Sequence, residues 1–119
     1  MSSQTKLSKK ITAVLKDLFP GHKFKLSFQE HQPEHFGNEI IEYEFEDFLM
    51  YMIKDRNELF VELAPKNSPN KHSQLPKLLE SIGAAKASDF TEHDFKSVTN
   101  QLELLSRNFP KIQNGLNIL

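Results

Sequence analysis

The stretch "NEIIEYEFEDFLMYMIKDRNELFVELAP", residues 38–65, decides the fold because it predicts three strands in succession. In its first part Ile41, Tyr43 and Phe45 alternate with glutamates, and alternate residues of a strand point to opposite faces of a sheet. The first strand therefore has one apolar face. Its acidic face carries Glu42, Glu44 and Glu46.

Two more strands follow, and short turns join them. The chain turns near residues 46–48, and "DRNE" at residues 55–58 is a polar four-residue turn of hairpin length. Connections this short make neighbouring strands antiparallel, which predicts a meander. We expect one apolar set to face the helices: Leu49, Tyr51, Ile53, Leu59, Val61 and Leu63. We expect a second set to point outward: Met50, Met52 and Phe60.

The flanking segments predict one further strand and three helices. In a first helix, apolar residues recur at three- and four-residue steps: Leu7, Ile11, Val14, Leu15 and Leu18. Phe24, Leu26 and Phe28 alternate with polar residues, as in a strand. Ser73 is a candidate cap for a second helix and Thr91 for a third. The tail, residues 111–119, keeps apolar residues with which to dock.

The predicted order of elements is α-β-β-β-β-α-α. Its simplest layered arrangement is an α+β fold, a four-stranded antiparallel β-meander with helices packed mainly on one face. With 119 residues, of which 38% are hydrophobic and 26% charged, residues 1–119 are expected to form a single α+β domain.

Composition excludes several classes of protein. The chain has no cysteine, so disulfides, thiolate zinc sites and thiol nucleophiles are excluded. Its longest uncharged apolar run is about six residues, whereas a membrane span needs roughly 20. The N-terminus has neither the apolar core nor the cleavage site of a secretory signal. We therefore expect a cytoplasmic protein without a membrane partner.

Charge is distributed unevenly along the chain. The net charge is −1, yet residues 1–28 hold six lysines and one aspartate. Residues 29–64 hold ten carboxylates against Lys54 and Arg56. An acidic block of this kind favours encounter with a basic partner.

The chain shows no motif that points to catalysis, a cofactor or a metal. It contains no G-x-S-x-G turn and no glycine-rich phosphate loop. His31 and His35 are separated by Pro33, which works against the helical spacing of a metal pair. The lysines of the first helix lack the arginine and aromatic residues typical of nucleic-acid binding. We therefore expect no enzyme, no cofactor and no nucleic-acid partner.

One surface of the predicted sheet suggests protein binding. Three apolar side chains would point outward beside glutamates, and an apolar centre with a polar rim is typical of an interface. The predicted partner-binding residues are Glu42, Glu44, Glu46, Met50, Met52, Phe60 and Glu62. Two alternatives stay open: the C-terminal tail covers the patch, or a second copy of the chain pairs with it.

Part of the chain resembles a known class of small bacterial proteins. "FGN" at residues 36–38, "KDRNELFVELAP" at 54–65 and "LPKLLESIG" at 75–83 are similar to immunity proteins of polymorphic toxin systems, including contact-dependent growth inhibition. The matching positions are Phe36, Gly37, Asn38, Asp55, Arg56, Phe60, Val61 and Pro65, and they cover under half of the chain.

The resemblance implies a protein that binds and does not catalyse. Immunity proteins neutralise a cognate toxin by covering its active site or a nearby exosite, and many such toxins are basic nucleases. An acidic surface would speed association with a basic toxin. Two alternatives are a secretion chaperone or adaptor for an effector protein, and a small homodimeric protein of unknown role.

Overall fold

The computed structural model describes residues 5–32, 34 and 37–118 and has an α+β fold with an open antiparallel sheet, as predicted. The strands are β1 (Phe24–Gln32), β2 (Asn38–Phe45), β3 (Phe48–Asp55), β4 (Glu58–Pro65) and β5 (Ser73–Gln74). The helices are α1 (Lys6–Leu18), α2 (Leu75–Ser81), α3 (Phe95–Arg107) and α4 (Phe109–Ile118), with a 3₁₀ turn, η1 (Ala87–Asp89), before α3. The strands lie in the sheet in chain order, from β1 to β5.

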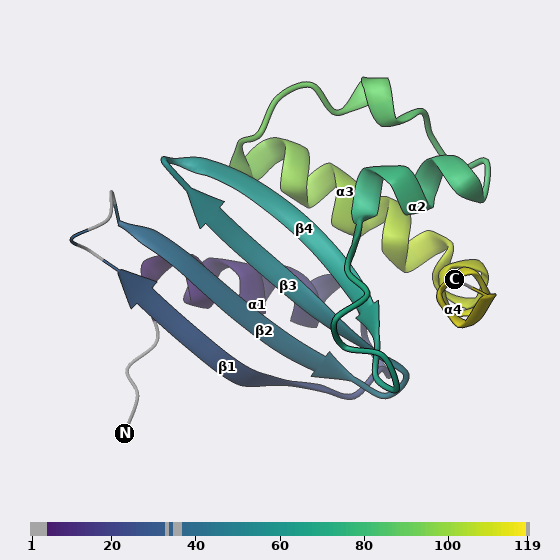
Figure 1. The fold of residues 1–119 in the computed structure, drawn as a ribbon, viewed down its shortest axis with the longest axis horizontal. Helices are drawn as coiled ribbons and strands as arrows, with labels where there is room; N and C mark the ends of the chain where they lie inside the picture. The colour runs from purple at the N-terminus through teal and green to yellow at the C-terminus, as the bar shows by residue number, and fades with distance from the viewer. Residues whose placement is uncertain (1–4, 33, 35–36, 119) are drawn as a thin grey trace.

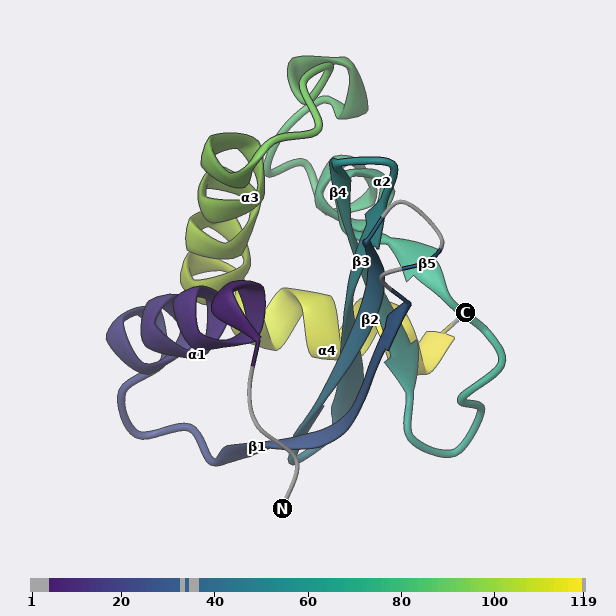
Figure 2. The ribbon, with the colours of Figure 1, turned by 90° about the vertical axis from the view of Figure 1, so that its left-hand side faces the viewer.

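The helices lie to one side of the sheet and beyond the edge formed by β4. Figure 1 looks onto the sheet, with α1 behind it and α2, α3 and α4 past β4. Figure 2 shows the sheet edge-on, with α1 and α3 on one side and the connection between β4 and β5 on the other. The side of β1, β2 and β3 that faces the viewer in Figure 1 is not covered by a described helix.

The count of elements differs from the sequence prediction by one strand and one helix. Ser73, expected to cap a helix, lies in β5 and pairs with Leu63, so that Gln74 becomes the residue before α2. The tail forms α4 because Pro110 lies in the first turn of that helix, where a missing N–H is tolerated. Ile112 is fully buried there, so the expected docking of the tail is confirmed.

The start of α3 also differs from the prediction. Asp94, and not Thr91, caps this helix, because its carboxylate accepts a hydrogen bond from the Ser97 N–H at 2.8 Å. A carboxylate at this position satisfies one of the free N–H groups at a helix start. In the first helix, Thr5 caps α1, because its hydroxyl oxygen accepts from the Ser8 N–H at 3.1 Å.

Polar contacts attach α1 to the sheet. The Tyr43 hydroxyl of β2 donates to the Ser8 carbonyl at 3.1 Å and lies 2.9 Å from the Thr12 hydroxyl. The Thr5 hydroxyl donates to the buried carboxylate of Glu39, also on β2. These contacts satisfy polar groups beneath the helix and set its position along the strand.

The expectation that Met50 and Met52 point outward is wrong. Both side chains are fully buried in the core, together with Tyr43 and Leu63. The register places Tyr43 opposite Met50 and Met50 opposite Leu63, and residues directly opposite each other share a face.

Two tight turns cause this register. β2 and β3 are joined by residues 46–47 alone, and β3 and β4 by Arg56 and Asn57 alone. Arg56 and Asn57 have φ angles of 51° and 70°, and positive φ at both positions is typical of a type I′ hairpin turn. A loop of two residues always pairs an odd-numbered residue with an even-numbered one. Leu63 therefore shares a face with Met50 and not with Leu49.

Truncation of neighbouring residues tests this register. Met52→Ala should lower the free energy of unfolding by about 2–5 kcal/mol, because it removes core contacts and leaves a cavity. Ile53→Ala should cost less than about half as much, because this side chain is only partly buried on the opposite face. Urea denaturation followed by circular dichroism measures both. A larger loss for Ile53→Ala would contradict the register.

Candidate protein-binding face

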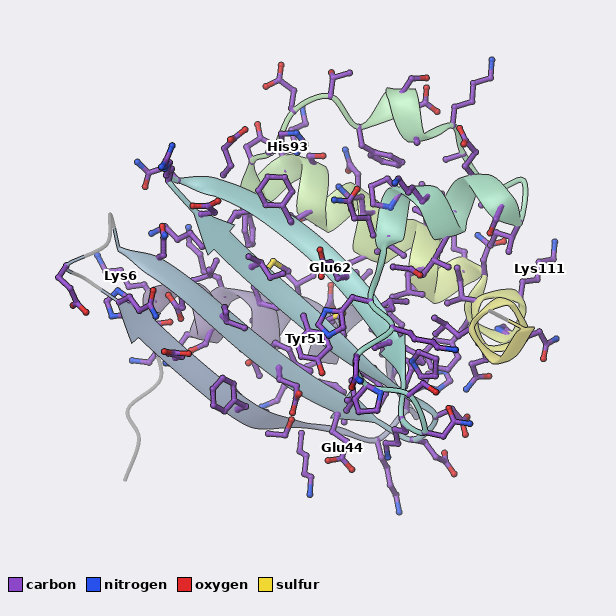
Figure 3. All side chains as sticks on the ribbon, in the orientation of Figure 1. Lys6, Glu44, Tyr51, Glu62, His93 and Lys111 are labelled. Atoms are coloured by element: carbon purple, nitrogen blue, oxygen red, sulfur yellow. The ribbon has the colours of Figure 1, made fainter. Side chains whose placement is uncertain are left out.

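The face of the sheet opposite α1, here called the outer face, consists of sixteen positions of β1 to β4. They are Lys25, Phe28, Glu30 and Gln32; Asn38, Ile40, Glu42 and Glu44; Leu49, Tyr51, Ile53 and Asp55; and Glu58, Phe60, Glu62 and Ala64. Figure 3 looks onto this face, with Glu44, Tyr51 and Glu62 labelled. A shift of register in β1 between Leu26 and Phe28 brings Phe28 to the outer face.

An apolar strip crosses the outer face, and we define it as Phe28, Ile40, Ile53 and Phe60. The register places Ile40 opposite Ile53 and Ile53 opposite Phe60, so these three side chains form one row across β2, β3 and β4. Phe28, on β1, lies diagonally next to Ile40. Phe28 is 49% exposed and Ile40 38%, which makes this strip the part of the described surface where large apolar side chains reach solvent.

Carboxylates surround the apolar strip. Six of the sixteen positions are acidic, and Lys25 is the one cation among them. The six are Glu30, Glu42, Glu44, Asp55, Glu58 and Glu62. An apolar centre inside an acidic border matches the anatomy of an interface for a basic partner.

Next to the apolar strip, Glu42, Tyr51 and Glu62 lie opposite one another on β2, β3 and β4, and hydrogen bonds hold their side chains. Glu42 accepts from the Ser27 hydroxyl at 2.7 Å and from the Tyr51 hydroxyl. The ring of His72 stacks on Tyr51 with centroids 4.2 Å apart, and His72 Nδ1 lies 2.9 Å from a Glu62 oxygen. Burial, and then the hydrogen bond and charge of Glu42, raise the pKa of Tyr51 to about 12. The face is therefore ordered before any partner arrives.

The chain itself covers one end of the outer face. The Nζ atom of Lys66 lies 3.1 Å from Oε2 of Glu44, and the Nζ atom of Lys25 lies 4.0 Å from Oε1 of the same carboxylate. The hydrogen bond and charge of Lys66 are the main causes that lower the pKa of Glu44. Ala64 is fully buried, and the connection formed by residues 66–72 lies on the outer side of the sheet in Figure 2. In Figure 1 this connection passes in front of the sheet whereas α4 lies past β4, and Ile40 and Phe28 stay open.

The structure places the predicted binding residues in three different settings. Glu42, Glu44, Phe60 and Glu62 lie on the outer face as predicted, with Phe60 half-buried against the His93 ring at 4.7 Å. Glu46 lies in the turn between β2 and β3 and is exposed. Met50 and Met52 lie in the core and cannot bind a partner. A binding role for the others stays a prediction.

Sequence reasoning missed the residues that replace the two methionines. It does not assign Ile40 to the surface, it turns Ile53 toward the helices, and it treats Phe28 only as a strand residue. The sequence does contain one indication of the correct register: Phe45 and Phe48 stand on either side of two acidic residues. Their rings stack with centroids 4.9 Å apart across the turn, and that pairing leads to the correct register.

Two further features that would indicate function in the described residues are a cluster of metal-ligating side chains and a long apolar helix. His31 is exposed on β1, and His35 lies outside the described residues, as does Phe36 of the resemblance. Residues 5–32, 34 and 37–118 contain no group of three or more side chains arranged to hold a metal ion. Within the same ranges, no helix has the length and apolar content that a membrane span requires.

Comparison with known proteins gives no match. No protein-family model fits the chain, and neither a curated protein nor a solved structure is significantly similar to it. Its function therefore has to be argued from the surface itself.

The two tyrosines provide a test of how well the face is ordered. Tyr43 and Tyr51 are the only tyrosines, and the chain has no tryptophan. Burial raises the pKa of Tyr43 above 10, and the pKa of Tyr51 is about 12. Since a raised pKa favours the protonated phenol in the folded state, the stability it contributes is present below pH 10 and is lost as pH rises through the folded-state values.

Alkaline titration followed by phenolate absorbance measures these groups directly. We expect no step near pH 10 in the folded protein, and ionisation of Tyr51 only near pH 12 or on unfolding. Tyr51→Phe is the control, because Tyr43 is then the only tyrosine of the chain. A step near pH 10 that has half of the total amplitude and disappears in Tyr51→Phe would show that Tyr51 is solvated and would contradict the ordered face.

Proposed function

We propose that this chain is a non-catalytic binding protein that neutralises a partner protein by laying its outer face on a basic surface of that partner. The observation that carries the proposal is the apolar strip, exposed on an open sheet face and bordered by six carboxylates. Sheet faces in water normally expose polar side chains, so Phe28 and Ile40 side by side call for a partner.

In such a complex the apolar strip would contribute mainly to affinity, and the surrounding carboxylates mainly to the rate of association. Burial of exposed apolar side chains supplies most of the binding free energy, and aromatic residues such as Phe28 are common at the centre of interfaces. The carboxylates act mainly on the rate of encounter and on the choice of partner, because charges at a rim speed association more than they tighten it. The hydrogen bonds around Glu42 and Tyr51 keep the ordering cost low.

The partner we propose is a bacterial toxin domain, which makes the chain an immunity protein. Two observations support this identity: the resemblance of residues 36–83 to immunity proteins, and the charge of the outer face, which complements the basic surface of a nuclease. The mechanism is steric and electrostatic occlusion. It requires a stiff sheet and no moving part.

A self-associating protein, such as a secretion chaperone or adaptor, is the second candidate. The observation in its favour is the edge strand β1, which pairs with β2 alone among the described strands. An open edge next to an exposed Phe28 could join a second copy. Light scattering separates the two candidates, since a monomer at micromolar concentration favours occlusion and a stable dimer favours self-association.

Co-expression with a toxin domain encoded beside this chain's gene tests the proposal. The wild-type chain should restore growth, and Ile40→Asp should abolish rescue because it places an unpaired charge in the apolar strip. The affinity of the purified pair should fall about tenfold or more, as for a residue at the centre of an interface. Because Ile40 already reaches solvent, the variant should stay folded.

Charge reversal gives a matched pair of controls. Glu30→Lys on the outer face should slow association, and this loss should shrink as salt is added. Asp17→Lys reverses an exposed carboxylate on α1 and should change neither rescue nor rate. Full rescue by Ile40→Asp would rule out the outer face. A neighbouring gene that encodes no toxin would overturn the toxin identity while leaving the binding face open to test.

A further inference from the structure

A cavity lies past the edge of β4, next to the Phe60 end of the apolar strip. β5 pairs only with Glu62 and Leu63, and beyond it the edge of β4 faces α2, the 3₁₀ segment and α3. The cavity is partly open to solvent and has a volume of about 270 Å³. Six of the residues that line it matter most: Leu59, Phe60, Pro76, Phe90, His93 and Gln101.

Gln101 is the unusual residue of this cavity. Its side chain on α3 is 3% exposed, and its amide nitrogen donates to the Ser97 hydroxyl at 3.3 Å. The amide oxygen is buried, and no described residue donates to it. Natural proteins rarely bury an acceptor in this state, and the exceptions often mark a functional position.

The walls of the cavity combine flat and apolar side chains with the polar side chains of Gln74, Lys77 and His93. The rings of Phe60 and His93 lie 4.7 Å apart with an interplanar angle of 35°, and Phe90 packs against the core. His93 is held in place because its carbonyl accepts from the Leu59 N–H at 2.9 Å. In Figure 3 its label lies at the top of the molecule, where the segment before α3 passes the start of β4.

We propose that this cavity binds a small planar aromatic group with a single hydrogen-bond donor, of the indole or phenol class. The ring would lie against Phe60 and Phe90, and its N–H or O–H would donate to the Gln101 oxygen. Aromatic walls favour an aromatic ligand, and a buried acceptor rejects analogues that leave it unpaired. The site needs no partner protein, so this proposal stands apart from the binding function of the outer face.

Matched ligands test the proposal on the full chain. Indole should bind in calorimetry or ligand-detected NMR about tenfold or more tightly than indene, which has the same shape but no N–H. Benzofuran, which offers an acceptor, should bind as weakly as indene. Equal affinities for indole and indene, or no binding of indole at millimolar concentration, would overturn the proposal.

A variant of Gln101 tests whether its amide oxygen causes the preference for indole over indene. Gln101→Met keeps the length of the side chain and removes the acceptor, so indole and indene should bind this variant equally. Gln32→Met makes the same change on β1, outside the cavity, and should keep the preference for indole. A preference that survives in Gln101→Met would contradict the proposal, and the wild-type comparison remains decisive if this variant fails to fold.

The same aromatic group could come from a free small molecule or from a protein side chain. N-acetyltryptophanamide distinguishes these sources, because it carries the indole on a peptide backbone. Binding as tight as that of indole assigns the cavity to an exposed tryptophan of a protein. Binding of indole alone assigns it to a free ligand.

Discussion

The pairing register of β2, β3 and β4 is the constraint on which the rest of the structure depends. Two loops of two residues impose it, and the positive φ angles of Arg56 and Asn57 close the second loop in the twist that a hairpin requires. A slip of one residue would exchange the two faces of β3 and expose Met50 and Met52. The core beneath α1 and the apolar strip on the outer face are therefore two results of one register.

Local pattern is sufficient for much of the fold. Four strands, an α+β class and the acidic face with Glu42 and Glu44 follow from alternation alone. β3 cannot be oriented this way, because from Phe48 to Ile53 it is apolar on both faces and its alternation does not distinguish them. Only the parity of the loop settles the question: the observed two-residue loop and a four-residue turn at residues 55–58 both pair Lys54 with Leu59, which excludes a shared face for Ile53 and Leu59.

The remaining features depend on tertiary contacts that no local pattern predicts. β5 forms because residues 66–72 return to β4, and this return places His72 on Tyr51 and Lys66 beside Glu44. The cavity beside Gln101 needs four separate segments to meet. Phe60 belongs to both sites, since it ends the apolar strip and also lines the cavity. A partner on the outer face would thus lie next to whatever occupies the cavity.

The reactivity of single cysteines tests the register most directly, because the chain has no cysteine of its own. In Ile53→Cys, the thiol lies on the partly exposed outer face and should react with a water-soluble reagent in the native state faster than the protein unfolds. In Met52→Cys, the thiol should react only as fast as the protein unfolds. Equal native-state rates, or faster reaction at position 52, would contradict the register and with it the outer face.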